Sequence, residues 1–466
     1  MRSIFLKTYI LGLIIATGII FSACNENIEI GKIDENKYAT TDKPIGYILD
    51  GQGKRNVGFV ELRNKSQVEV YLALTKAAKE DAVAAIKYDP AVLEAYNKAN
   101  NTNYILLPQT LVTLGSDLKV AKESKKSEKL EITLTSNASL DANITYALPL
   151  STQIKSGGIV MAEKESNFII LVKDLSKMPT SDKATGIKIV SCMEVNDTNP
   201  LNNLCFTLKK SGKPLFDQVI LFSANINYNN ETGRVYVYNN PNVQHLLDNR
   251  EKYIKPLQDN GIKVILGILG NHDRSGVANL SDATARAFAQ ELKAVCDAYK
   301  LDGVFFDDEY SSYQMPPPPG FVNPSRQAAA RLCYETKKAM PHKIVSVYVY
   351  SLTSSLPDVD GVQSGAFVDY ALHDYNQGYD LSDSFPGMPK SAMGLYSQEY
   401  GRNNFAYDVN LRRLREEEYG AHMIFSLNPF RYNFKDAQLS SLRQVADILF
   451  DDELVYNEKP YAKDWK

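Results

Sequence analysis

The stretch LDGVFFDDEY at residues 301–310 decides the fold, because it is an apolar run of strand character that ends in acidic residues. Successive side chains of a β-strand point to opposite faces, so Asp307 and Glu309 share one face while Asp302 and Asp308 share the other. Catalytic residues of α/β barrels lie at the carboxyl ends of the strands. We therefore interpret Asp307 and Glu309 as a candidate catalytic pair at the end of one barrel strand.

Residues 187–466 contain eight apolar runs of this kind, most of them followed by a stretch with helical periodicity. This alternation predicts an α/β fold, a (β/α)8 TIM barrel. A doubly wound open sheet is the alternative, but no G-x-G-x-x-G follows the first strand. The expected strands are 187–194, 218–228, 263–270, 301–309, 343–350, 368–375, 391–399 and 422–429, and the expected helices are 242–258, 282–299, 324–340, 408–419 and 435–450.

Residues 45–173 have a different pattern, with short alternating runs separated by polar or glycine-containing turns. This pattern predicts a small β-sandwich that precedes the barrel. The Ala, Leu and Tyr spacing of residues 77–101 predicts one or two short helices within the sandwich. A polar linker at 174–186 joins the two domains. The expected strands of the sandwich include 56–62, 67–73, 129–135, 143–149 and 168–172.

The first residues have the order of a secretory signal: basic Arg2 and Lys7, an apolar run at 9–21, and small residues before Cys24. This arrangement resembles a bacterial lipobox, which implies that residues 1–23 are removed and that Cys24 is lipidated. An ordinary cleaved signal with an incidental cysteine is the alternative. Residues 24–44 are then a polar tether. We expect a lipid-anchored protein exported across the inner membrane, at the outer membrane or cell surface of a Gram-negative bacterium.

Composition excludes several classes of partner. A net charge of -3 and a pI near 6.1 give no reason to expect nucleic-acid binding. The remaining cysteines are widely spaced, and the five histidines form no HxxxH or HxH pair, so we predict no metal. We also predict a monomer. One disulfide remains an alternative to buried thiols for Cys192, Cys205, Cys296 and Cys333.

Two carboxylates on one strand are neighbours and cannot flank a sugar from opposite sides. This spacing argues against the mechanism in which one carboxylate attacks and another protonates the leaving group. It fits a substrate-assisted reaction, in which the carbonyl oxygen of an N-acetyl group attacks the anomeric carbon. Asp307 would hold the amide, and Glu309 would act as the acid and then as the base. Repulsion from Asp307 is expected to keep Glu309 protonated near neutral pH.

LDGVFFDDEY resembles the DGxDxDxE signature of glycoside hydrolase family eighteen. The segments DDEYSSYQMPPPPGFVNPS, VSVYVYS, VDYALHDY and GAHMIFSLNPFRYNF are similar to endo-β-N-acetylglucosaminidases of the endoglycosidase F and H type. The resemblance implies that Glu309 is the general acid/base, that Asp307 orients the N-acetyl group and that Tyr375 steadies the oxazolinium intermediate. EAYNKANNTNYILLPQ and TYALPL resemble the N-terminal β-sandwich of surface glycan-processing lipoproteins, which implies a carbohydrate-binding or docking module or a spacer.

The sequence departs from the family pattern in two places. Phe305 occupies the position of the first strand-four aspartate, and the tryptophan of the chitinases is absent, since the only tryptophan is Trp465. Phe425 or a tyrosine is expected to take the place of that tryptophan. The residues expected to contact substrate at the strand ends are Asn227, Tyr228, Asn271, Phe305, Gln398, Glu399 and Phe425.

The resemblance implies hydrolysis of the GlcNAc-β-1,4-GlcNAc bond in the core of Asn-linked glycans, with high-mannose or hybrid glycans favoured. It also implies retention of configuration and a reaction with no metal or organic cofactor. The expected partner is thus an N-glycan on a glycoprotein or a free oligosaccharide. Two alternatives stay open. One is a non-catalytic surface glycan-binding lipoprotein, which Phe305 favours, and the other is a chitinase-like member of the family.

Overall fold

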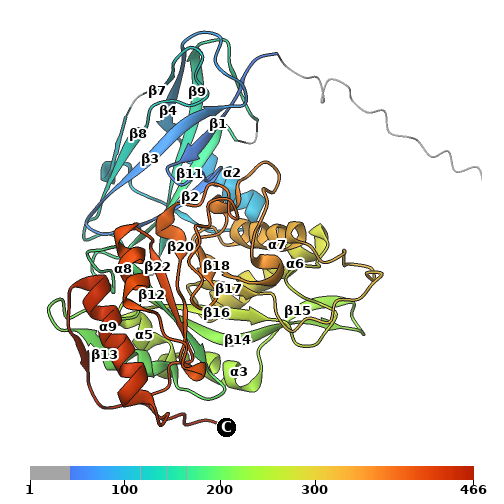
Figure 1. Ribbon diagram of the computed structural model, residues 1–466. Coiled ribbons are helices and arrows are strands. Elements are labelled where there is room, and N and C mark those ends of the chain that lie inside the picture. Colours follow the sequence, from blue (N-terminus) through green and yellow to red (C-terminus); the bar gives the residue numbers. More distant parts are fainter. Residues whose placement is uncertain (1–41, 116, 143, 164) are drawn as a thin grey trace, which may run out of the picture. The chain divides into compact units, whose positions relative to one another are not determined.

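The structure is a computed structural model that describes residues 42–115, 117–142, 144–163 and 165–466 (Figure 1). The chain divides into the units Met1–Lys43 and Pro44–Lys466, and the second unit contains both the sandwich and the barrel. The expected signal at 1–23 and Cys24 lie outside the described residues. In the described part of the chain, no helix has the length and apolar character needed to cross a membrane.

Two sheets that enclose an apolar core form the predicted sandwich. Ile48, Leu72 and Ile132 of the first sheet and Leu148 and Phe168 of the second belong to this core. The first sheet has the order β10 (Val160–Met161), β1 (Ile45–Asp50), β3 (Lys65–Leu74), β8 (Leu130–Thr135) and β6 (Val112–Leu114). The second has the order β2 (Val57–Leu62), β11 (Asn167–Asp174), β9 (Thr145–Ser156), β4 (Ala82–Tyr88) and β7 (Asp117–Val120), with β5 (Ile105–Leu106) beside β9.

Residues 77–101 differ from the helical prediction in their first half. Strand β4 occupies Ala82–Tyr88, and only the second half is a helix, α2 (Pro90–Asn100). The sequence Asp89-Pro90 separates the two, because the Asp89 carboxylate accepts a hydrogen bond from the Ala91 N–H at 3.1 Å and proline suits the first helical position. Pairing of β4 with β7 and β9 overrides the helical tendency of its alanines.

Eight parallel strands form the predicted barrel, and the first and last of them pair, which closes the sheet. Closure excludes the open-sheet alternative, since an open sheet leaves two unpaired edges. The strands, in order around the barrel, are β12 (Lys188–Glu194), β14 (Gln218–Asn229), β16 (Lys263–Leu269), β17 (Gly303–Asp307), β18 (Ile344–Val349), β19 (Tyr370–His373), β20 (Met393–Gly394) and β22 (Ala421–Phe425).

Side-chain alternation along β17 follows the prediction. Phe305 packs in the barrel interior with Cys192 and Tyr348, whereas Val304 and Phe306 belong to the outer core between strands and helices. The acidic end of β17 therefore continues the inward-facing row of Phe305. Elsewhere in the barrel, β15 (Arg234–Tyr238) forms a hairpin with β14, and β13 (Phe206–Leu208) pairs with β23 (Leu454–Tyr456).

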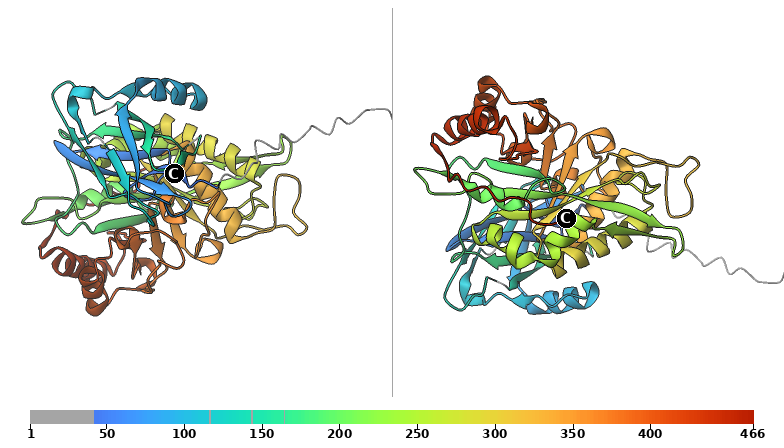
Figure 2. Two further views of the ribbon diagram at one scale, coloured as in Figure 1. Left: turned by 90° about the horizontal axis from the view of Figure 1, so that it is seen from above. Right: turned by 90° about the horizontal axis from the view of Figure 1, so that it is seen from below.

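The outer helices are less regular than predicted. The expected helix 242–258 is three short helices, and the expected seventh strand is divided into β20 and β21 (Gln398–Glu399) by Tyr396 at φ 54°. Short 3-10 turns, rather than α-helices, follow β18 and β19 in the described chain. Among the α-helices, α6 packs beside α7 and α8 beside α9 (Figure 2). These helices are α3 (Pro241–Asp248), α4 (Arg250–Tyr253), α5 (Lys255–Asp259), α6 (Asp282–Ala298), α7 (Arg326–Ala339), α8 (Asp408–Glu416) and α9 (Leu439–Phe450).

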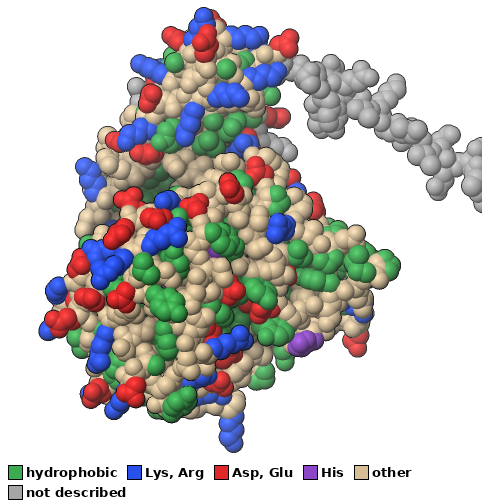
Figure 3. Space-filling model, in the orientation of Figure 1, with side chains coloured by type: hydrophobic (Ala, Val, Ile, Leu, Met, Phe, Trp, Pro, Cys, Tyr) green, Lys and Arg blue, Asp and Glu red, His purple; other side chains and the backbone are tan. Residues whose placement is uncertain are grey.

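The sandwich contacts the barrel where the barrel strands begin. Glu61 forms an ion pair with Lys263, the first residue of β16. Lys54 Nζ lies 3.3 Å from Oδ1 of Asp369, which directly precedes β19. The carboxyl end of β17 lies at the opposite end of the barrel. On the molecular face of Figure 3, basic and acidic side chains are interspersed over the barrel, in keeping with the small net charge.

Lys183, within the expected linker, is tied to the barrel. Its ammonium group forms an ion pair with Asp217 and donates a hydrogen bond to the Leu215 carbonyl at 2.8 Å, and both charged side chains are 3% exposed. Oδ2 of Asp217 also accepts a hydrogen bond from the Ile189 N–H at 2.7 Å. Residues 174–186 are therefore anchored at the start of β12.

Replacing this lysine is expected to destabilise the protein. Lys183→Met leaves the carboxylate of Asp217 buried without its cation, which should lower the free energy of unfolding by about 3–5 kcal/mol. Denaturant titration measures the change. Lys209→Met, which removes an exposed partner of Glu453, serves as the control and should change stability little. Equal effects of the two substitutions would contradict the assigned role of Lys183.

Candidate active site

The predicted pair lies at the mouth of the barrel. Asp307 is the last residue of β17 and is 4% exposed, while Glu309 is partly buried two residues further on. Gly270, after β16, fixes this segment because its N–H donates to the Glu309 carbonyl at 3.1 Å. A Cβ at Gly270 would lie 2.3 Å from that carbonyl oxygen, so the close approach requires glycine.

Burial is the main cause of the perturbed acidity of both groups. It raises the pKa of Asp307 well above its usual range, and the carboxyls of Glu309, Asp308 and Asp374 raise that pKa further. Burial also raises the pKa of Glu309, with Asp374 as the next cause and Arg402 opposing it. Asp374 is therefore a further carboxyl that helps to keep Glu309 protonated. Repulsion between Asp307 and Glu309 disfavours ionisation of both groups together.

Asp302 and Asp308, the other acidic residues of the motif, stabilise the fold through hydrogen bonds. Asp308 accepts hydrogen bonds from the Tyr313 hydroxyl and, at 3.1 Å, from the Leu352 N–H. Asp302 accepts from the Val264 N–H at 2.9 Å. Both carboxylates thus connect neighbouring loops and strands, as their position on the outer face of the strand predicts.

Tyr375, two residues after the end of β19, is part of an aromatic cluster. Its ring centroid is 6.3 Å from that of Tyr348 and 6.4 Å from that of Phe425. Oδ1 of Asp374 accepts from the Tyr348 hydroxyl at 2.5 Å and from the Tyr375 N–H at 2.7 Å, so Asp374 orients both tyrosines. Sequence reasoning missed Asp374, although it stands beside Tyr375 in the motif HDY, because β19 ends at His373 and strand alternation stops there.

The floor beneath Asp307 is apolar. Phe305 is 1% exposed in the barrel interior, with its ring centroid 6.4 Å from that of Tyr348. Burial, and then the carboxyls of Glu194 and Asp307, raise the pKa of the nearby Cys192 thiol. Oδ1 of Asp307 accepts no hydrogen bond from the described residues. The interior thus holds Asp307 by packing, with Phe305 in place of a second carboxylate.

Two of the predicted contact residues meet each other. The Asn271 side-chain amide donates to Oδ1 of Asn227 at 3.2 Å, next to the glycine that supports Glu309. Tyr228 faces the other way, and its ring packs against Phe321 at 5.4 Å. The side chains of Asn227 and Asn271 are therefore placed near the mouth, whereas Tyr228 belongs to the outer packing.

Gln398 lies behind the mouth. It is fully buried, its Nε2 is 2.9 Å from Nε2 of His422, and its Oε1 accepts from the Ala406 N–H and the Ser441 hydroxyl, each at 2.8 Å. These contacts tie β21 to its surroundings. The neighbouring Glu399 points the opposite way and lines a pocket, as strand alternation requires.

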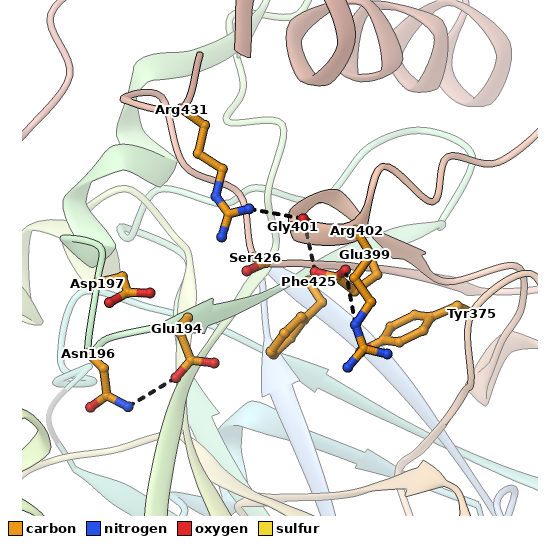
Figure 4. A pocket seen from close by; sticks show the side chains of 10 residues that line it. All are labelled: Glu194, Asn196, Asp197, Tyr375, Glu399, Gly401, Arg402, Phe425, Ser426 and Arg431. Carbon is orange, nitrogen blue, oxygen red and sulfur yellow. Dashed lines mark hydrogen bonds and ion pairs between the residues drawn. The ribbon is translucent and has the colours of Figure 1, made fainter. Parts of the chain in front are cut away.

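This pocket has a volume of about 430 Å³, and Tyr375 is one of the residues that line it (Figure 4). Glu194 and Asp197 lie on one side of it, and Glu399 and Arg402 lie on the other. Phe425 also lines the pocket, at the end of β22. The mouth of the barrel thus joins a carboxylate pair, an aromatic cluster and a polar pocket.

Among the described residues, no three His, Cys, Asp or Glu side chains are grouped so that they would hold a metal ion. Cys192, Cys205, Cys296 and Cys333 are buried and carry free thiols.

A closed parallel barrel with buried carboxyl groups and aromatic rings at its carboxyl end is typical of glycoside hydrolases. Endo-beta-N-acetylglucosaminidase F1 of Elizabethkingia meningoseptica is 63% identical over 287 residues, which cover 61% of this chain and 85% of that relative. The endo-beta-N-acetylglucosaminidase of Flavobacterium sp. (strain SK1022) is 36% identical over 282 residues, 60% of this chain and 84% of that relative. The chain therefore belongs to the endo-β-N-acetylglucosaminidases, and it is a glycoside hydrolase.

Solved structures agree with this assignment. Crystal structures of EndoBT-3987 from Bacteroides thetaiotamicron, with Man5GlcNAc product and with Man9GlcNAc2Asn substrate, are 36% identical to this chain. Each match covers 90% of this chain and 97% of the EndoBT-3987 chain. The TM-score is 0.81 for the product complex and 0.75 for the substrate complex. Residues 40–159 match a family model described as a "-like, N-terminal domain". The relationship to EndoBT-3987 thus extends over the sandwich as well as the barrel.

The carboxyl of Asp374 should set the upper pH limit of hydrolysis. Glu309 must be protonated to act as an acid, so activity is lost as the pH rises through its pKa. Asp374→Asn keeps the acceptor oxygen for both tyrosines but removes a negative charge that raises the pKa of Glu309. The alkaline limb of the pH–rate profile should therefore move to lower pH.

Initial rates of hydrolysis across the pH range measure this shift. The control is Asp360→Asn, which removes an exposed partner of Arg331 and should leave the profile in place. An unchanged or alkaline-shifted limb in Asp374→Asn would refute the influence of Asp374 on Glu309.

Proposed function

We propose that the protein hydrolyses the GlcNAc-β-1,4-GlcNAc bond in the core of Asn-linked glycans and leaves one GlcNAc on the protein, with high-mannose or hybrid glycans favoured. The observation that carries this proposal is the pair Asp307 and Glu309 at the mouth of a barrel of this family. Support for the substrate comes from EndoBT-3987, which holds a mannose-bearing substrate and product in its crystal structures.

The reaction follows the substrate-assisted course of glycoside hydrolase family eighteen. Glu309 donates its proton to the leaving glycosidic oxygen while the N-acetyl carbonyl oxygen attacks the anomeric carbon. Asp307 accepts a hydrogen bond from the amide N–H and stabilises the positive charge of the oxazolinium intermediate, and Tyr375 lies beside it. Glu309 then takes a proton from water, which attacks the anomeric carbon and opens the oxazolinium ring. Two inversions give net retention.

Removing the acid should abolish glycan release. Glu309→Gln keeps the size of the side chain but has no proton to donate, so the rate should fall by about 10²- to 10⁴-fold. Mass spectrometry of a high-mannose glycoprotein before and after incubation measures release. Glu453→Gln, at an exposed glutamate that pairs with Lys209, is the matched control and should remain active.

The same assay separates the alternatives. Release by Glu309→Gln at the wild-type rate would reject Glu309 as the acid. Binding of the glycan without release by the wild type would support a silent binding protein, and cleavage of chitin oligomers alone would support a chitinase.

We also propose that the mature protein is anchored by lipid on Cys24 and works as a monomer at the surface of a Gram-negative bacterium. The order of basic, apolar and small residues before Cys24 supports the lipid anchor. The sandwich contacts the barrel at the end opposite to the active site, which leaves the mouth free for a glycoprotein.

Loss of the acylated cysteine should release the protein from the membrane. Cys24→Ser removes the thiol that carries the lipid, so the protein should move from the membrane fraction to the soluble fraction. Fractionation and immunoblotting measure this change. Cys333→Ala, at a buried cysteine, is the control and should stay with the membrane. Wild-type protein found only in the soluble fraction would refute the anchor.

A further inference from the structure

A second pocket lies away from the mouth of the barrel, where the sandwich meets the barrel. This interdomain pocket has a volume of about 430 Å³. The sandwich contributes residues 101–105, which join α2 to β5, and residues 144–145, where β9 begins. The barrel contributes Lys293 and Asp297 of α6 and also His342, two residues before β18 (Figure 1). The interdomain pocket is therefore near the end of the barrel opposite to the catalytic pair.

The loop that carries most of the lining is held in shape by Asn97 of α2. Oδ1 of Asn97 accepts hydrogen bonds from the Thr102 hydroxyl at 2.8 Å and from the Tyr104 N–H at 3.2 Å. The side-chain amide of Asn97 donates to the Tyr104 carbonyl at 3.0 Å. The Asn103 side chain, between these residues, is exposed and has no hydrogen-bond partner among the described residues. A fixed loop with a free amide is suited to a ligand, because little conformational entropy is lost on binding.

Aromatic and apolar side chains form another part of the wall. The Tyr104 hydroxyl lies 3.3 Å from Nδ1 of His342, and the two rings meet edge to face with their centroids 6.1 Å apart. Ile105 lines the same pocket and is 50% exposed. Binding sites for small molecules typically combine apolar surface of this kind with a few polar groups that fix the orientation of the ligand.

The charged groups of the lining are paired with each other or with a neighbour. Nζ of Lys293 lies 2.7 Å from Oδ2 of Asp297, and Nζ of Lys343 lies 3.4 Å from Oδ1 of Asp297. Burial, and then Lys343, lower the pKa of His342 to about 3, so its imidazole is neutral near pH 7. A phosphate or carboxylate ligand would find no unpaired cation among these residues. Amide, hydroxyl and imidazole groups beside apolar surface instead match a neutral saccharide, which has hydroxyl groups and apolar ring faces.

We propose that the interdomain pocket is a second, non-catalytic binding site for a neutral saccharide, with Asn103 and Ile105 as contact residues. This inference goes beyond the proposed hydrolysis and does not depend on it. A saccharide held at this end of the barrel leaves the mouth free for a second glycan. Binding there would hold the enzyme at a glycan-rich surface and raise the effective concentration of its substrate.

Calorimetry with Glu309→Gln protein, which should retain its ligand uncleaved, tests this site. The probes are an oligomannose, a GlcNAc oligomer and a maltooligosaccharide, which share the same chemistry but differ in the sugar. At least one of them should bind at the interdomain pocket. Asn103→Ala or Ile105→Ala in the same protein should weaken that binding about 5- to 10-fold. Asn100→Ala is the matched control, since Asn100 is exposed at the end of α2 outside the lining, and it should leave the affinity unchanged.

Steady-state kinetics separate this site from the active site. In the otherwise wild-type chain, Asn103→Ala should leave kcat and KM for a short glycopeptide unchanged, and thermal unfolding checks that each variant is folded. Failure of all three saccharides to bind, or an unchanged affinity in both pocket variants, would overturn this inference. A loss of affinity accompanied by an equal rise in KM would also overturn it, because the contact would then belong to the active site. Absence of hydrolysis by the wild type would instead overturn the proposed function alone.

Discussion

Pairing of β12 with β22 closes the sheet, and closure obliges every strand to send alternate side chains into one narrow interior. The interior is filled by Phe305 and its apolar neighbours, so the next inward side chain, Asp307, lies at the boundary between this packing and the mouth. Its acidity follows from that position. A carboxyl group with little water and an apolar floor resists ionisation, and nearby carboxyl groups increase the effect. Closure of the barrel thus raises the pKa of Asp307 before substrate binds.

The apolar floor beneath Asp307 changes the roles of the neighbouring carboxyl groups. With Phe305 in the interior, no second aspartate shares a proton with Asp307 from below. The charge that raises the pKa of Glu309 comes instead from the side, from Asp374, which also orients Tyr348 and Tyr375. The protonation of the acid and the placement of the aromatic rings therefore depend on one carboxylate.

Local sequence predicted the elements whose patterns agree with their packing. The barrel, its eight strands and the inward face of β17 followed from apolar runs and alternation. The prediction was wrong where tertiary pairing or a special backbone conformation intervened. The alanines of β4 have helical tendency but pair with two strands, and Tyr396 breaks the seventh strand by its left-handed conformation. Gln398 and Glu399 were equivalent in sequence, yet only Glu399 lines the pocket, because adjacent residues of a strand face opposite ways.

The sequence by itself determined the fold class, because hydrophobic periodicity is a property of neighbours along the chain. It indicated the family through the resemblance of LDGVFFDDEY and the segments after it to known endoglycosidases. It also placed both carboxylates on one face. Only the tertiary structure decided the environment of that face. Asp374, Glu194 and Glu399 come from strands or loops far apart in sequence, and their effects depend on distance and burial, which arise when the barrel closes. A sequence motif therefore could not predict the electrostatic interactions across the mouth of the barrel.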